Sequence, residues 1–186
     1  MVEEILQEVR ALMKKAVEAL RRDLAAIRTG RASTSMLEHV RVEYYGNLTP
    51  LNQVATLSVP EPRLITIRPW EQKMVAVIEK AIRADKTLGL NPSNDGSLIR
   101  VPIPELTEER RHEIAKLARQ RAEEGRVAVR HGRREGMDLV SAAQKDGDIS
   151  EDEARHAQAE IQKLTDDFVS QIDEIARHKE AEIMQV

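Results

Sequence analysis

The stretch Thr107–Asp146, TEERRHEIAKLARQRAEEGRVAVRHGRREGMDLVSAAQKD, decides how the rest of the chain is interpreted. As a single helix with a rise of about 1.5 Å per residue, it is a rod about 60 Å long. Such a rod is about twice as long as a small domain is wide, so we expect other long elements to pack along it or a partner to bind along it.

One face of this expected helix is apolar but unusually small. At about 100° per residue, its apolar and small side chains fall on one stripe, as in the inward face of a bundle helix. The middle of the stripe has alanine and glycine where leucine or isoleucine is usual. Each glycine inside a helix costs about 1 kcal/mol relative to alanine, so we expect neighbouring helices to approach closely there. The expected inward residues are Ile114, Ala118, Ala122, Gly125, Val129, Gly132, Gly136, Leu139, Val140 and Ala143.

A second face of the same helix is basic. Between Arg110 and Arg134 the sequence has nine arginines and lysines against three glutamates, whereas the whole chain has a formal net charge of -3. Few carboxylates stand three or four residues from these arginines, so we expect most of them to be unpaired. The pattern is typical of a surface that binds a phosphate backbone, and a merely solvated helix face is the alternative. The basic stripe consists of Arg119, Arg126, Arg130, Arg133 and Arg134.

The composition limits the class of protein. Hydrophobic residues make up 41% of the 186 residues and aromatic residues only 2%, which favours helices packed through aliphatic side chains. The absence of cysteine excludes disulfides and thiolate chemistry. No apolar run reaches the length of a membrane span, and the N-terminal stretch is acidic, unlike a signal peptide. We therefore expect a cytoplasmic protein.

The remaining chain divides into helical and β-rich parts. Ser150 and Glu153 form a capping-box pattern at the start of a last, acidic helix. Trp70 and the pair Tyr44–Tyr45 are expected to pack locally, with base stacking as the alternative for the tyrosines. The spacing of apolar residues predicts long helices over 2–29, 107–146 and 150–184, a short helix over 71–84, and strands over 40–44, 54–59, 64–67 and 98–103.

This order predicts an α+β fold, an antiparallel three-helix bundle with an inserted small β/α/β domain. The bundle domain would be discontinuous, with residues 1–30 and 106–186, and the inserted domain would span 31–105. Two connections join them, Gly30–Arg31 and Pro104–Glu105, and we interpret these four residues as a hinge.

Six separated regions of the sequence carry a resemblance to a known family. They contain LAAIRTGRAS (24–33), VEYYG (42–46), EKAIR (79–83) with LGLNPSN (88–94), PELTEERR (104–111), EEGRVAVR (123–130) with RRE (133–135), and ISEDE (149–153) with EIQKLTDDF (160–168). In this order and over its whole length, the chain resembles the bacterial ribosome recycling factors. It departs from their pattern at His131–Gly132, where asparagine followed by valine or isoleucine is expected, and at Gly136, where alanine is usual. The two glycines question the rigidity of the helix beside its arginines.

The resemblance implies a translation factor that binds the post-termination ribosome. With elongation factor G and GTP, such a factor promotes dissociation into subunits, so that mRNA and tRNA are released. GTP is used by the elongation factor, so no cofactor is expected for the chain itself. The implied partners are the large ribosomal subunit with its rRNA and elongation factor G, and we expect a monomer with no membrane contact. The implied rRNA-binding residues are Arg110, Arg111, Arg126, Arg130, Arg133 and Arg134.

Two other classes of protein were considered. A scaffold that oligomerises through a coiled coil would have leucine-rich heptads, whereas the inward stripe is small and irregular. A small-molecule hydrolase would need a nucleophile or metal constellation, and the five histidines lack metal-ligand spacing. We therefore predict a non-enzymatic RNA-binding protein.

Overall fold

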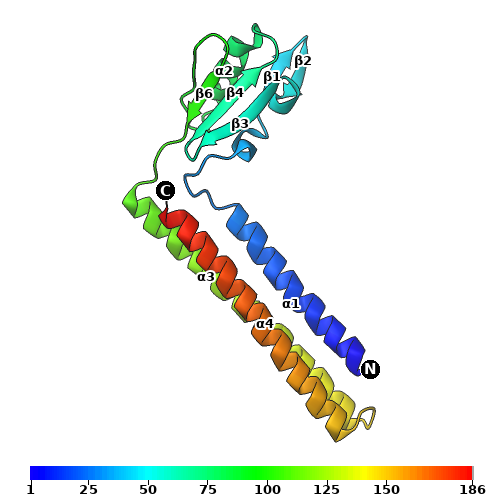
Figure 1. Cartoon of the computed structure of the whole chain (residues 1–186). Coiled ribbons are helices and arrows are strands. Elements are labelled where there is room, and N and C mark those ends of the chain that lie inside the picture. The colour runs from blue at the N-terminus through cyan, green and yellow to red at the C-terminus, as the bar shows by residue number, and fades with distance from the viewer. Residues whose placement is uncertain (186) are drawn as a thin grey trace. The chain divides into compact units, whose positions relative to one another are not determined.

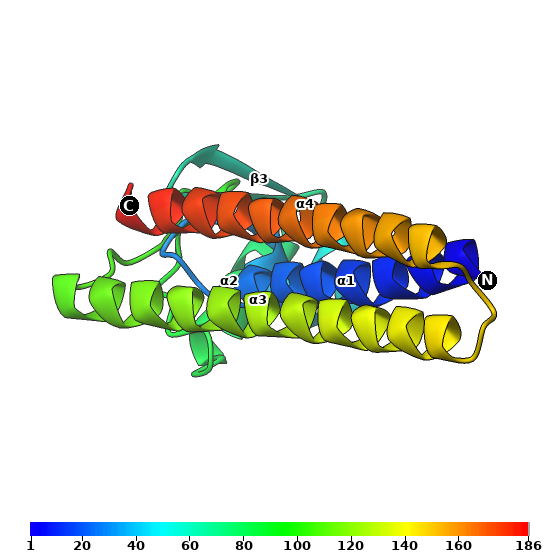
Figure 2. The ribbon, with the colours of Figure 1, turned by 90° about the horizontal axis from the view of Figure 1, so that it is seen from below.

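Three long helices pack side by side in the first unit of the structure, a computed structural model that describes residues 1–185 (Figures 1 and 2). They are α1 (Val2–Ala25), α3 (Glu108–Lys145) and α4 (Glu151–Met184). Helix α1 runs antiparallel to α3, and its N-terminal end lies near the turn between α3 and α4 (Figure 2). The predicted fold class, α+β with an antiparallel three-helix bundle, is confirmed.

The bundle core is aliphatic, as the scarcity of aromatic residues requires. Met13 and Leu20 of α1 are buried, as are Ile161 and Ile172 of α4. Leu20 and Ile172 both lie beside Gly125 of α3, and Met13 lies beside Gly132. Helix α3 is continuous through Gly132 and Gly136. The small residues of its stripe are buried, which agrees with the expected close approach of the helices.

Two details of the bundle differ from the sequence prediction. Leu139, expected inward, is 41% exposed because it lies at the margin of the stripe, while Val140 takes the core position. Helix α1 ends at Ala25 rather than Thr29. The Ile27 amide already bonds the carbonyl of Leu24, and Gly30 has a φ of +79°, so the helix closes early.

The turn between α3 and α4 follows from local sequence. Gly147 takes a φ of +81°, and the amide of Asp148 reaches back to the carbonyl of Ala143 at 2.9 Å. Ser150 then caps α4 through the reciprocal bonds with Glu153 that the capping-box pattern predicts.

The second unit, Gly30–Thr107, contains two antiparallel sheets and one helix. Strands β1 (Arg41–Tyr44) and β2 (Asn47–Pro50) form a hairpin. The larger sheet has the order β3-β4-β6-β5, and α2 (Met74–Ala84) contributes to the same core as this sheet. The strands of the larger sheet are β3 (Ala55–Glu61), β4 (Leu64–Pro69), β5 (Ser93–Asn94) and β6 (Ile99–Pro102), and short 3-10 turns are η1 (Thr34–Leu37) and η2 (Leu51–Gln53).

Three expectations for this unit are wrong. Residues 47–50 and 93–94, which lie outside the predicted strands, form β2 and β5 because each finds a partner strand. Helix α2 begins at Met74 rather than Glu71. Trp70, expected to be a packing anchor, is 64% exposed.

Contacts divide the chain into Met1–Thr29 with Glu108–Gln185 and, separately, Gly30–Thr107. Independent domains with boundaries at 30/31 and 105/106 stay a prediction.

Candidate nucleic-acid interface

Helix α3 presents its arginines along the side that meets α4. Arg130 and Arg134 are exposed, whereas Arg126 and Arg133 are half-buried and bond residues of α4. The basic stripe is therefore a real surface feature, and its inner edge forms part of the contact between α3 and α4.

Arg126 is one of the two half-buried members of this group, with a side chain 23% exposed. Its Nε donates to Oδ1 of Asp173 at 2.8 Å, and its Nη1 donates to Oε2 of Glu123 at 3.1 Å. Two carboxylates thus hold one guanidinium between α3 and α4.

Glu123 links Arg126 to Arg130. Its second oxygen, Oε1, accepts a bond from Nη1 of Arg130 at 3.3 Å. The hydrogen bond from Arg126, reinforced by that from Arg130, holds the pKa of the Glu123 carboxyl below its usual value of 4.5. Glu123 is therefore ionised at neutral pH and keeps the two guanidinium groups in a fixed relation.

Arg133 is held by a neutral partner instead. Its Nε donates to Oε1 of Gln162 at 2.8 Å, and the amide nitrogen of Gln162 donates to Oδ1 of Asp166 at 2.9 Å. The recorded bond uses only Nε, so the terminal nitrogens of Arg133 keep their donor capacity. The chain Asp166–Gln162–Arg133 orients the guanidinium without neutralising it directly.

Arg130 and Arg133 also line an open pocket of about 470 Å³ between α3 and α4. Thr165 and Ser170 add hydroxyl groups to its wall, and Asp166 and Asp173 add carboxylates. The carboxylates disfavour a free anion deep in this pocket, so the outer, exposed edge of the arginines is where a phosphate would bind.

The expectation that the arginines are unpaired is wrong for most of the stripe. Arg119 donates to Glu180 at 2.5 Å, and Arg126 bonds Asp173. These acids belong to α4, so spacing within α3 alone could not reveal them. Within residues 1–185, Arg134 has no recorded ion pair or hydrogen bond.

The two other predicted rRNA-binding residues lie in the first turn of α3. Arg110 donates to Glu113 at 2.9 Å, and Arg111 is half-buried. Between Arg110 and Arg130 the helix rises about 30 Å. The six predicted residues therefore form two groups along one helix: Arg110 and Arg111, and then Arg126, Arg130, Arg133 and Arg134.

The sequence prediction missed three residues of this surface. Gln162, Asp166 and Asp173 all lie on α4 and fix the orientation of arginines on α3. The one signal in the sequence was that the last helix is acidic and the helix before it is basic. This indicates ion pairs between the two helices but does not show which residues form them.

The predicted hinge residues lie next to two chain segments that are hydrogen-bonded to the turn at Pro62–Arg63. In the inserted unit, the amide of Ala32 bonds the carbonyl of Pro62 at 2.7 Å, and the amide of Ile103 bonds that of Arg63 at 2.8 Å. Both connections are therefore attached to one turn. Gly30 and Arg31 precede the first anchor, Pro104 follows the second, and Glu105 forms an ion pair with Arg63.

The described residues hold neither a metal-binding cluster nor a membrane-spanning helix. Within residues 1–185, no three or more metal-ligating side chains gather in one place. In the same part of the chain, no helix is both long and apolar enough to cross a membrane.

Comparisons with known proteins agree on one family. A family model described as "Ribosome recycling factor" matches residues 20–184. The ribosome-recycling factor of Anaeromyxobacter dehalogenans strain 2CP-1 is 55% identical over 99% of this chain and 97% of its own, and that of Geobacter metallireducens is 51% identical over both full lengths.

Solved structures give the same result. A solution structure of ribosome recycling factor matches 100% of this chain and 98% of its own, with a TM-score of 0.72 and 45% identity. A second match covers 98% of both chains with a TM-score of 0.62 and 49% identity. It comes from models of the T. thermophilus ribosome recycling factor and the E. coli elongation factor G bound to the E. coli post-termination complex.

Proposed function

Since the chain belongs to the ribosome recycling factor family, we propose that it binds the post-termination ribosome and, with elongation factor G and GTP, promotes dissociation into subunits. Release of mRNA and tRNA for a new round of translation follows from this dissociation. The proposal is supported by similarity over the full chain and by the assembly of one structural relative with elongation factor G on the post-termination complex.

The large subunit would be bound through α3. Its arginines carry positive charge on a helix of an otherwise acidic protein, and their exposed edges are suited to charge-assisted bonds with rRNA phosphates. The observation that supports this role best is the orientation of Arg126, Arg130 and Arg133 by Asp173, Glu123 and Gln162. Preorganised guanidinium groups lose less conformational entropy when they bind. We assign Arg110, Arg111 and Arg134 to the same contact.

In this role the chain catalyses no reaction of its own and needs no cofactor, because GTP is used by the elongation factor. It would act as a monomer, and a ribosomal site of action implies a cytoplasmic location.

The two units would act as separate domains. Gly30, Arg31, Pro104 and Glu105 are proposed as the hinge, because they lie at the two connections beside one anchored turn. Movement of the inserted unit by the elongation factor would then be transmitted to the rigid bundle.

Co-sedimentation with large ribosomal subunits over a salt series tests the assigned surface. The wild-type protein is compared with Arg130→Ala/Arg133→Ala and with the control Arg10→Ala/Lys14→Ala, which removes the same charge from exposed positions of α1. We expect salt-sensitive binding that the α3 variant loses and the control retains. Equal binding by all three proteins would contradict the role of α3.

A further inference from the structure

The larger sheet of the inserted unit has one buried and one open face. Ile65 and Ile67 of β4 point toward the core that α2 shares. Because side chains alternate along a strand, Thr66, which is buried, and Arg68, which is exposed, lie on the other face. Thr56 of β3 is opposite Arg68 in the register, so it belongs to the open face too.

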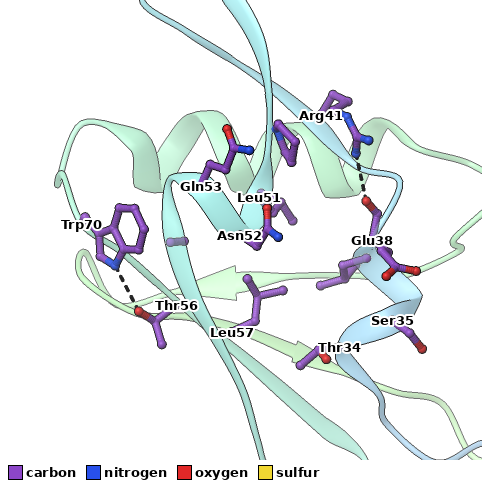
Figure 3. A pocket seen from close by; sticks show the side chains of 13 residues that line it. Thr34, Ser35, Glu38, Arg41, Leu51, Asn52, Gln53, Thr56, Leu57 and Trp70 are labelled. Carbon is purple, nitrogen blue, oxygen red and sulfur yellow. Dashed lines mark hydrogen bonds between the residues drawn. The ribbon is translucent and has the colours of Figure 1, made fainter.

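Trp70 lies on this open face in a fixed orientation. Its indole Nε1 donates to Oγ1 of Thr56 at 3.0 Å, while 64% of the residue stays exposed (Figure 3). The bond satisfies the polar group of the ring and leaves its π surface to solvent. An exposed aromatic ring that is already immobilised is suited to stacking against a planar partner, because little entropy is lost on binding.

Trp70 also borders an open pocket of about 640 Å³ between β3, η1 and η2. Figure 3 shows the indole at one side, Asn52 and Gln53 between, and Arg41 at the other side. The amide side chains of Asn52 and Gln53 are exposed and have no recorded hydrogen bond within residues 1–185. Each amide offers both donors and an acceptor to a ligand.

Two arginines belong to this surface, Arg41 in the lining of the pocket and Arg68 near the end of β4. Arg68 is exposed near the end of β4, two residues before Trp70, and has no recorded ion pair in the described chain. The Nη1 atom of Arg41 is anchored on the carbonyls of Glu38 and Val40 at 2.9 and 3.3 Å. Glu38 is the one carboxylate among the residues that line the pocket.

We propose that this surface of the inserted unit binds an unpaired segment of RNA. One base stacks on Trp70, the amides of Asn52 and Gln53 bond its polar edge, and Arg68 and Arg41 bind the flanking phosphates. Stacking combined with basic side chains is how proteins hold single-stranded nucleic acid. Apolar atoms make up most of the open surface of the pocket, while the exposed residues that line it, apart from Trp70, carry polar or charged side chains. This mixture suits a base with flanking phosphates better than an apolar peptide. The site is separate from α3 and goes beyond the function proposed above.

The fluorescence of Trp70, the single tryptophan of the chain, reports on this site directly. The full-length protein is titrated with an unstructured RNA of about ten nucleotides at low salt. We expect saturable quenching of the indole fluorescence. Inorganic polyphosphate, which has charge but no bases, should compete only weakly and should not quench.

Variants locate the binding within the chain. With fluorescently labelled RNA, Trp70→Ala is expected to lower the affinity about tenfold, whereas Trp70→Phe, which still stacks, changes it little. Arg68→Ala should weaken both binding and quenching. The matched control Lys80→Ala removes an exposed charge from α2 and should have no effect. Arg133→Ala, on α3, should leave the quenching unchanged.

Quenching that Arg68→Ala leaves intact, or the absence of quenching at low salt, would overturn the proposal. A photo-crosslinking amino acid in place of Gln53 then distinguishes RNA from protein as the partner when the protein is bound to the ribosome. RNA crosslinks support the proposal, and crosslinks exclusively to ribosomal protein contradict it. The oligonucleotide titration needs no ribosome, so its result is independent of whether α3 binds the large subunit.

Discussion

At the scale of single residues, the arginines of α3 differ in how they are held. Arg126 is fixed by two carboxylates, Arg133 by the neutral Gln162, and Arg134 by no recorded partner within residues 1–185. An arginine that is oriented but not neutralised combines low entropy cost with full charge. Arg133 is therefore expected to contribute more to phosphate binding than Arg126.

Replacing Arg133 by alanine should weaken binding to the large subunit by about 1 to 3 kcal/mol, the range for a lost bond to a charged group. Gln162→Ala keeps the charge of Arg133 and removes only the hydrogen bond that orients it, so we expect a smaller loss of affinity. Binding titrations measure both, and thermal unfolding serves as the control because neither side chain belongs to the apolar core. Unchanged affinity of a normally folded Arg133→Ala protein would remove this residue from the interface.

The glycines of α3 are not equivalent. A Cβ atom at Gly136 would lie 2.5 Å from Cγ2 of Val9 and 3.1 Å from Cδ1 of Ile161, whereas at Gly132 the nearest atom, of Met13, is 3.5 Å away. Gly136 thus permits the close packing of α1, and Gly132 only lowers the helix propensity of α3.

Alanine at these two positions should have opposite effects. Gly132→Ala is expected to stabilise the protein by up to about 1 kcal/mol through helix propensity. Gly136→Ala should destabilise it by about 1 to 3 kcal/mol through overpacking against the stiff Val9 side chain. Urea unfolding followed by circular dichroism measures both. Adding Val9→Ala to Gly136→Ala should restore part of the loss, and a stabilising Gly136→Ala would contradict the close contact.

At the scale of elements, the start of α4 depends on one reciprocal pair of bonds. The amide of Ser150 donates to the Glu153 carboxylate at 2.7 Å, and the amide of Glu153 donates to the Ser150 hydroxyl at 3.1 Å. The backbone bond from Ser150 lowers the pKa of Glu153 below its usual value of 4.5. Ser150→Ala is expected to cost about 1 kcal/mol of stability.

The contribution of Glu153 should depend on pH. Its pKa is lower in the folded than in the unfolded protein, so its contribution is present above a pH of about 4.5 and is lost as the pH falls through the folded-state value. The difference in Tm between wild type and Glu153→Ala should therefore be largest near neutral pH and should shrink in acid. Asp152→Ala, in the same helical turn but without a bond to the cap, is the matched control. A difference that stays constant with pH would contradict the cap as its source.

At the scale of the whole molecule, the proposed hinge can be separated from the RNA-binding surface. Gly30 has a φ of +79°, which alanine adopts at a cost of about 1 to 2 kcal/mol. Gly30→Ala is expected to slow subunit dissociation driven by elongation factor G without weakening binding to the large subunit. Gly89, with a φ of +61° and open space around it, gives the matched control Gly89→Ala. Equal effects of the two variants on recycling would assign the loss to general strain and contradict the hinge.

The sequence by itself determined the features that depend on local periodicity. Apolar spacing placed the three long helices to within a few residues, and Ser150 and Glu153 gave the start of α4 because a capping box involves only neighbouring residues. The stripe of small residues in α3 predicted close packing of the helices. The arginines on another side of the same helix predicted the basic face. The fold class followed from the order of these elements.

Only the tertiary structure decided which groups meet. Asp173 and Gln162 reach Arg126 and Arg133 from another helix, so the spacing within α3 wrongly indicated free arginines. Residues 47–50 and 93–94 have turn-like sequences and became strands because a neighbouring strand offers hydrogen bonds. Trp70 stayed exposed because it follows the end of β4 and its indole donates to Thr56 on the open face of the sheet. In each case the deciding contact joins residues distant along the chain, and its free energy exists only once the fold has brought them together.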